Sequence, residues 1–128
     1  MKSLVSFIVS LGFCFVLLIG CIKSFDIIVI DSGDKIPIFR FESSGIISTR
    51  GVEIDNFYIY LFNENSESFV WRIESIDSKQ HFVEEIKYGI VPDGFSEIIK
   101  PITLISGSNY VAGSRMPGKV GWVDFVLK

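Results

Sequence analysis

The sequence predicts an all-β protein, a single β-sandwich that follows an N-terminal signal peptide. The chain has 128 residues, of which 48% are hydrophobic and 21% charged, so it is long enough for one domain and too apolar to be disordered. Beyond residue 21, short runs of β-branched and aromatic residues alternate with turns that contain Gly, Pro and Asp. No window there shows the 3.6-residue period of an amphipathic helix, so strands are expected throughout.

The first half of this region contains three predicted strands. Residues 25–30 are mostly β-branched and end at the turn residues 31–34. Residues 37–41 are expected at a sheet edge, because Pro37 has no amide hydrogen to donate to a neighbouring strand. Residues 57–62 are continuously apolar, which is typical of a strand covered on both faces.

The second half begins with a clear alternation. In residues 69–74, Phe69, Trp71 and Ile73 alternate with a mostly polar set and are predicted to form one buried face. Residues 82–90 are predicted to form one strand, closed by a Pro-Asp-Gly turn. Further strands are predicted at residues 98–105, 110–112 and 120–127, with the glycine-rich residues 113–121 as a hairpin loop.

The N-terminal segment has the features of a secretory signal. Lys2 is followed by an apolar run over residues 4–19, slightly short of the roughly 17–25 residues that a membrane-spanning helix needs. The run ends at Leu18-Ile19-Gly20-Cys21, which resembles a bacterial lipobox. A plain signal-anchor helix and a buried N-terminal helix are the alternatives. The resemblance implies a lipoprotein signal peptide over residues 1–20.

The lipobox resemblance also implies a cleavage between Gly20 and Cys21 and a lipid on the thiol of Cys21. That lipid would attach a single β-sandwich domain, residues 21–128, to a membrane. The next residue is Ile22 and not an aspartate, which by resemblance to enteric lipoprotein sorting implies the periplasmic face of the outer membrane. Cys14 would leave with the signal, so we expect neither a disulfide nor a free thiol.

Charge and composition limit the remaining functions. The net charge is −3, which argues against a nucleic-acid partner. His81 is the only histidine, so a two-histidine zinc site is excluded, and we expect no metal and no cofactor.

A stretch near the C-terminus resembles a known structural motif. Residues 104–110 read Leu-Ile-Ser-Gly-Ser-Asn-Tyr, similar to the E–F corner of fibronectin type III domains, where the tyrosine hydroxyl bonds back to the chain. The segments around Trp71 and Tyr88 are similar to two further strands of that family. The resemblance implies an immunoglobulin-like or fibronectin type III-like sandwich in which Trp71, Tyr88, Leu104 and Tyr110 are structural.

A second resemblance concerns function. Trp71, residues 86–89 and 91–95, Gly107 and Tyr110 are arranged as in small lipoproteins of Gram-negative bacteria, some of which are labelled type VI secretion immunity lipoproteins. The resemblance implies a protein partner, and a secreted toxin in the immunity version.

Two short motifs match catalytic or nucleotide sites but have simpler explanations. Asp31-Ser32-Gly33 matches the core of aspartic proteases, which in the retroviral type act as dimers, yet the same residues are common in a strand-ending turn. Residues 113–120 match a P-loop through Lys119, but a P-loop opens onto a helix and the residues that follow are predicted to form a strand. We favour the turn and the hairpin.

Aromatic residues make up 14% of the chain, and most are expected to fill the core. Tyr58, Tyr60 or Trp122 are candidates for an exposed binding patch, and loops at one end of the sandwich are the usual contact site. We therefore expect a non-enzymatic, lipid-anchored periplasmic module that binds another protein. The alternatives are a structural envelope lipoprotein, a small-ligand binder and, most remotely, a retroviral-type aspartic protease.

Overall fold

The computed structural model describes residues 23–31, 35–44, 47–63 and 68–128. These residues form β1 (Phe25–Ile30), β2 (Ile38–Ser43), β3 (Thr49–Arg50), β4 (Val52–Ile54), β5 (Asn56–Leu61), β6 (Ser68–Ser75), β7 (His81–Val83), β8 (Glu85–Lys87), β9 (Phe95–Ile99), β10 (Asn109–Met116) and β11 (Lys119–Val126). The described part contains no helix of the length and apolarity that a membrane crossing requires. Gly20 and Cys21, with the predicted signal boundary, lie outside the described residues.

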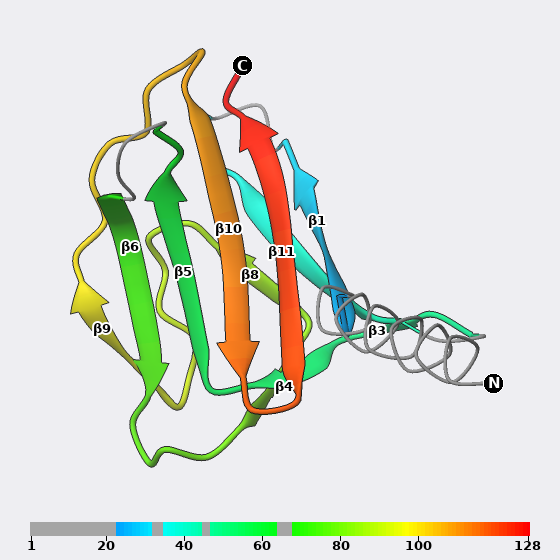
Figure 1. The fold of residues 1–128 in the computed structure, drawn as a ribbon. Helices are drawn as coiled ribbons and strands as arrows, with labels where there is room; N and C mark the ends of the chain where they lie inside the picture. Colours follow the sequence, from blue (N-terminus) through cyan, green and yellow to red (C-terminus); the bar gives the residue numbers. More distant parts are fainter. Residues whose placement is uncertain (1–22, 32–34, 45–46, 64–67) are drawn as a thin grey trace, which may run out of the picture.

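Two antiparallel sheets pack face to face, which confirms the all-β sandwich. The larger sheet has the order β11-β10-β5-β6-β9 and faces the viewer in Figure 1. Behind it lies a sheet in which β2 pairs with β1, β3 and β8. A two-stranded ribbon of β4 and β7 joins the two at one end.

Most strands are ordered as in an immunoglobulin-type sandwich, but β9 departs from it, because it follows β8 in the chain and yet lies beside β6 in the other sheet. In that fold strands A, B and E are neighbours in one sheet, and strands G, F and C are neighbours in the other. Here β1, β2 and β8 take the places of A, B and E, while β11, β10 and β5 take those of G, F and C. β6 follows β5 in the position of strand C′ of variable-type domains.

The core is dominated by an inner aromatic cluster, which comprises Phe39, Phe41, Phe57, Trp71 and Tyr88. The Phe57 ring lies at its centre, 5.2 Å from Phe39, 5.6 Å from Phe41 and 6.0 Å from Trp71 between ring centroids. Tyr88 packs edge-on against Trp71 at 5.3 Å. These separations are within the range in which aromatic pairs attract, and all rings except that of the half-buried Tyr88 are completely buried.

The predicted edge position of the second strand is wrong. β2 pairs with β1 on one side and with both β3 and β8 on the other, so it lies inside its sheet. Pro37 does not interfere, because it precedes the strand and its carbonyl accepts a hydrogen bond from the Tyr88 amide at 3.0 Å. A proline just before the first ladder residue is compatible with a central strand.

The predicted coverage of β5 on both faces is also wrong. Phe57 and Ile59 are completely buried on its inner face, but Tyr58 and Tyr60 on its outer face are only half-buried. Tyrosine counts as apolar in a sequence pattern, yet its hydroxyl suits a surface that remains in contact with water.

A β-bulge breaks the alternation that was predicted for β6. Ile59 lies opposite Trp71 and Tyr60 lies opposite Phe69, so Val70 is an extra residue without a partner on β5. Val70 and Trp71 are therefore both buried, and Phe69 turns to the outer face, where it is 39% exposed. The alternation correctly placed Trp71 and Ile73 in the core but placed Phe69 on the wrong face.

The predicted strand over residues 82–90 is two strands in different sheets. β7 pairs with β4 and β8 pairs with β2, and the chain bends between them at Glu84. Glu84 and Glu85 are both exposed, because this bend interrupts the alternation that would have placed them on opposite faces.

The last predicted boundaries need similar corrections. The strand predicted over residues 98–105 ends at Ile99, as β9. Residues 113–121 are mostly strand: β10 continues to Met116 and β11 begins at Lys119, which leaves Pro117 and Gly118 as the turn. Since no helix follows Lys119, this hairpin is not a P-loop.

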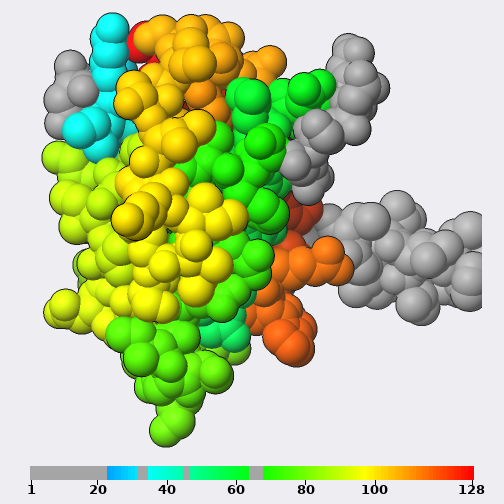
Figure 2. Space-filling view, turned by 90° about the vertical axis from the view of Figure 1, so that its left-hand side faces the viewer, coloured from blue at the N-terminus to red at the C-terminus, as the bar shows by residue number. Residues whose placement is uncertain are grey.

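The two sides of the sandwich differ. On one side β1 lies against β11, and the Ser24 amide donates to the Val120 carbonyl at 2.7 Å. On the other side β9 is the last strand of its sheet, and residues 90–105, yellow to amber in Figure 2, cover that side.

Candidate functional site

The outer face of the five-stranded sheet carries a second group of aromatic rings. This outer aromatic cluster consists of Tyr58, Tyr60 and Phe69. The two tyrosine rings stack at 6.1 Å with an interplanar angle of 24°, and Phe69 meets both edge-on at 5.9 and 6.1 Å. All three rings remain partly exposed, so the cluster presents apolar surface to the solvent.

Two local features of the backbone build the cluster. The bulge at Val70 turns Phe69 outward, toward the side chains that alternate outward along β5. Gly113 lies directly opposite Tyr58 on β10, and a Cβ atom there would come within 3.0 Å of the Tyr58 ring. Glycine at 113 therefore makes room for the Tyr58 ring to lie flat across the neighbouring strand.

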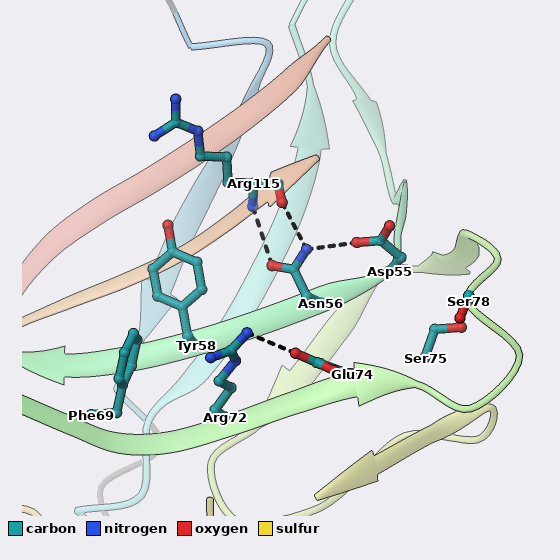
Figure 3. A pocket seen from close by; sticks show the side chains of 9 residues that line it. All are labelled: Asp55, Asn56, Tyr58, Phe69, Arg72, Glu74, Ser75, Ser78 and Arg115. Carbon is teal, nitrogen blue, oxygen red and sulfur yellow. Dashed lines mark hydrogen bonds and ion pairs between the residues drawn. The ribbon is translucent and has the colours of Figure 1, made fainter. Parts of the chain in front are cut away.

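A groove of about 370 Å³ opens beside the cluster, as Figure 3 shows. Strands β5, β6 and β10 and the turn after β6 supply its walls. It is lined by Asp55, Asn56, Tyr58, Phe69, Arg72, Glu74, Ser75, Ser78 and Arg115. The groove thus has an aromatic end at Tyr58 and Phe69 and a polar end at Asp55 and Ser78.

Arg72 links the aromatic end of the groove to the polar end. Its guanidinium lies 5.6 Å from the centroid of the Phe69 ring and donates to Glu74 at 2.7 Å. The ring face and the carboxylate together hold the arginine along the floor of the groove, although both charged groups remain substantially exposed. Such an exposed pair contributes little to stability, and it is available to exchange partners on binding.

Arg115 is positioned on the opposite wall by the side chain of Asn56. The Asn56 amide donates to the Arg115 carbonyl at 2.8 Å and to Asp55 at 2.6 Å, and its oxygen accepts from the Arg115 amide at 3.3 Å. This side chain continues the ladder between β5 and β10 past its last backbone pair, Tyr58 with Gly113. Within the described residues the Arg115 guanidinium has no ion pair.

The predicted patch residues are thus only partly brought together. Tyr58 and Tyr60 adjoin, but Trp122 lies on β11 beyond Gly113, where the Lys23 ammonium lies 4.7 Å from the centroid of its ring. Phe69 was not predicted to belong to an exposed patch, because a bulge cannot be recognised in a sequence that alternates regularly. The outer aromatic cluster and the groove lie on a sheet face, whereas the loops at one end of the sandwich were predicted as the usual contact site.

The four residues predicted to be structural lie in or beside the core. The Trp71 indole is completely buried and donates to Glu97 at 3.0 Å. The Tyr88 hydroxyl donates to the Ile102 carbonyl at 2.5 Å, and burial raises its pKa to about 12. The buried Tyr110 hydroxyl accepts from the Ile105 amide at 2.9 Å, as in a tyrosine corner, and Leu104 packs against the core.

Neither Asp31 nor His81 lines the groove. Asp31 is exposed just after β1, and the rest of the aspartic-protease motif, residues 32–34, lies outside the described residues. His81 begins β7 at the surface, with its Nε2 2.8 Å from Asp77. Hydrogen bonds from Ser75, His81 and the Lys79 amide hold the pKa of Asp77 well below its usual range. The described residues contain no cluster of three or more metal-ligating side chains.

The outer aromatic cluster thus borders a groove that contains Arg72 and Arg115, and three adjacent strands contribute side chains to its lining. No protein-family model matches the chain, and no curated protein and no solved structure matches it.

Proposed function

We propose that this chain is a lipid-anchored periplasmic module that binds another protein through the outer aromatic cluster and the groove beside it. The observation that carries the proposal is the gathering of Tyr58, Tyr60 and Phe69 with Arg72 and Arg115 on one open sheet face. Aromatic residues and arginine are the types enriched at protein interfaces and at their energetic hot spots. Partly exposed rings retain apolar area that a partner can bury.

The proposed anchor is the lipid on Cys21, on the periplasmic face of the outer membrane. Its support is the lipobox resemblance of residues 18–21. In the specific version that the similarity to immunity lipoproteins favours, the partner is a secreted toxin that acts in the periplasm.

The arrangement of the groove favours binding over catalysis. Arg72 is paired with Glu74, and Asp55 accepts from Asn56, so the polar groups at the floor and the polar end hold one another in place. A volume of about 370 Å³ also falls in the range of small-molecule sites, which makes a small ligand the second candidate for the same groove.

Site-specific crosslinking in cells tests the proposal. A photoreactive phenylalanine analogue at Phe69 in the full chain should give an adduct of defined mass with one protein. Ile28, on the outward side of β1 in the other sheet, is the matched control because it is 40% exposed where Phe69 is 39% exposed. We expect no adduct from Ile28.

Alanine variants make the test quantitative. Tyr58→Ala should weaken capture of the crosslinked protein about 30-fold, the effect of losing a typical hot spot of about 2 kcal/mol. Equal adducts from Phe69 and Ile28, or none from Phe69, would contradict the protein-binding role. A small molecule that protects Phe69 from every adduct would instead support the ligand-binding alternative.

The anchor is tested separately. The wild-type chain should incorporate labelled fatty acid, and Cys21→Ser should lose the label and accumulate as a precursor. A wild type without label, or with a mature N-terminus other than Cys21, would overturn the anchor and leave the binding surface to be judged on the crosslinks alone.

A further inference from the structure

The chain enters the sandwich at Ser24, and three hydrogen bonds fix that residue to the fold. Its amide donates to the Val120 carbonyl at 2.7 Å, and its hydroxyl accepts from the Val120 amide at 3.1 Å. Its carbonyl accepts a short hydrogen bond from the Ser44 hydroxyl. The domain is therefore held firmly from Ser24 onward.

Only Ile22 and Lys23 separate Ser24 from Cys21. Three residue steps of extended chain span at most about 11 Å. A lipid on Cys21 would consequently hold the Ser24 end of the sandwich within about 11 Å of the membrane surface. This step rests on the lipid anchor in the proposed function.

Two exposed apolar side chains lie at the same end of the sandwich as Ser24. Phe82 is 61% exposed, and Ile47, near the tip of the hairpin between β2 and β3, is 80% exposed. The Phe82 ring lies directly on Gly51, so closely that a Cβ atom at Gly51 would overlap it. A hollow of about 320 Å³ has both Ser24 and Phe82 in its wall, so the two share one surface. In Figure 1 the start of β1 and β3 lie together on the right-hand side.

Two lysines accompany these apolar groups. Lys23 lies over the Trp122 ring, and Lys119 donates to the Glu53 carbonyl at 3.4 Å and to Gln80 at 3.3 Å. Aromatic side chains and lysines together are typical of protein surfaces that lie at the lipid headgroups.

We propose that the Ser24 end of the sandwich, with Phe82, Ile47, Lys23 and Lys119, docks on the lipid surface and holds the anchored domain in one orientation. The short tether brings this end to the bilayer whether or not it binds there. Phe82 and Ile47 then bury apolar area among the headgroups, and the two ammonium groups meet lipid phosphates.

Tryptophan fluorescence in vesicles tests the docking. The full lipidated chain is reconstituted into vesicles of phosphatidylglycerol and bromine-labelled phosphatidylcholine, whose bromines quench nearby indoles. Relative to the wild type, Phe82→Trp should add emission that is blue-shifted and strongly quenched. Ile47→Trp is a second reporter at the same end.

Ile105→Trp is the matched control. The exposed fraction of Ile105 is 66%, close to the 61% of Phe82. Ile105 lies near Leu127, and Leu127 is about 20 Å along β11 from Val120, which pairs with Ser24. We expect its added emission to remain unquenched. Thermal unfolding of each variant shows that the domain is folded.

Fatty-acid labelling of the same preparations separates the two proposals. If the chain is labelled and Phe82→Trp and Ile47→Trp are quenched no more than Ile105→Trp, the docking is overturned while the anchor stands. In that case the exposed Phe82 is left for a protein partner. If the chain carries no label, the anchor fails and the docking argument fails with it.

Discussion

Strands β5 and β6 contribute rings to both the inner and the outer aromatic cluster, yet the environments of the two clusters are opposite. Phe57 lies at the centre of the inner cluster and is completely buried, whereas the next residue, Tyr58, belongs to the outer cluster and is half-buried. Ring centroids lie 5.2–6.0 Å apart in the inner cluster and 5.9–6.1 Å apart in the outer cluster. The distances between rings therefore do not distinguish a cluster that fills the core from a cluster that lies on the surface. The two clusters differ in the apolar area that remains in contact with water.

The largest effect is expected at the centre of the inner cluster. Phe57→Ala removes the ring that contacts Phe39, Phe41 and Trp71 and leaves a cavity between the sheets. The free energy of unfolding should fall by about 3–5 kcal/mol, measured by urea denaturation. Phe62→Ala is the control, because Phe62 is 59% exposed and should cost little. Similar losses for both variants would contradict the assignment of Phe57 to the core.

A smaller effect is expected where the outer cluster depends on glycine. In Gly113→Ala the added methyl group would lie 3.0 Å from the Tyr58 ring, so the ring has to move away from β10. We expect a loss of about 1–3 kcal/mol in the free energy of unfolding and a loss of partner capture. Tyr58→Ser should remove most of the penalty, so a double-mutant cycle should show coupling between positions 58 and 113. Additive effects would mean that the ring does not occupy that space.

A third prediction concerns the polar rim of the inner cluster and is pH-dependent. The pKa of Tyr88 is about 12 in the folded protein, because the hydroxyl is buried, against an ordinary value of 10.0. Since the folded state holds its proton more tightly, this group contributes stability below pH 10, and that contribution is lost as the pH rises from 10 toward 12.

Tyr88→Phe should therefore change the free energy of unfolding in two ways. It removes the hydrogen bond to Ile102 and should cost about 1 kcal/mol at neutral pH. It should also remove the part of the alkaline loss of stability that comes from Tyr88. Urea denaturation of both proteins at pH 7, 9 and 10.5 measures the difference. An equal loss of stability between pH 9 and 10.5 in the two proteins would show that burial does not raise the pKa of this hydroxyl.

The two clusters also differ in how far the sequence predicts them. Part of the inner cluster follows from local patterns: the alternation in residues 69–74 placed Trp71 in the core, and Phe57 lies in an apolar run that was predicted to be covered on both faces. The outer cluster needs the bulge at Val70, which reverses Phe69, and the pairing of Tyr58 with Gly113. The bulge arises in the pairing of β5 with β6, the next strand along the chain, and the contact with Gly113 arises in the pairing of β5 with the distant β10. The alternation within a single strand shows neither pairing.

The same limit explains the other corrections. Glu84 bends the chain between two sheets, and nothing within residues 82–90 marks that change, because each half is a plausible strand on its own. The position of Arg115 in the groove depends on Asn56, which is 59 residues away in the sequence. By contrast, the hydrogen bond of the Tyr110 hydroxyl to Ile105 spans only five residues, and a short sequence motif was enough to anticipate it.

The smallest effect on stability is expected at the edge of the outer cluster, and it is the sharpest test of the contrast. Phe69→Leu keeps an apolar side chain on the outer face but removes the flat ring that meets Tyr58 and Tyr60 edge-on and lies under Arg72. Since Phe69 is already partly exposed, unfolding should change by about 0.5 kcal/mol or less. Capture of the partner protein should nevertheless fall, because leucine offers neither the contact area nor the ring face that orients Arg72.

Urea denaturation and quantitative capture, performed on the same preparations, measure the two effects of Phe69→Leu. If Phe69→Leu destabilises the fold by as much as Phe57→Ala, or binds the partner as the wild type does, the outer cluster is an extension of the core and not a binding surface.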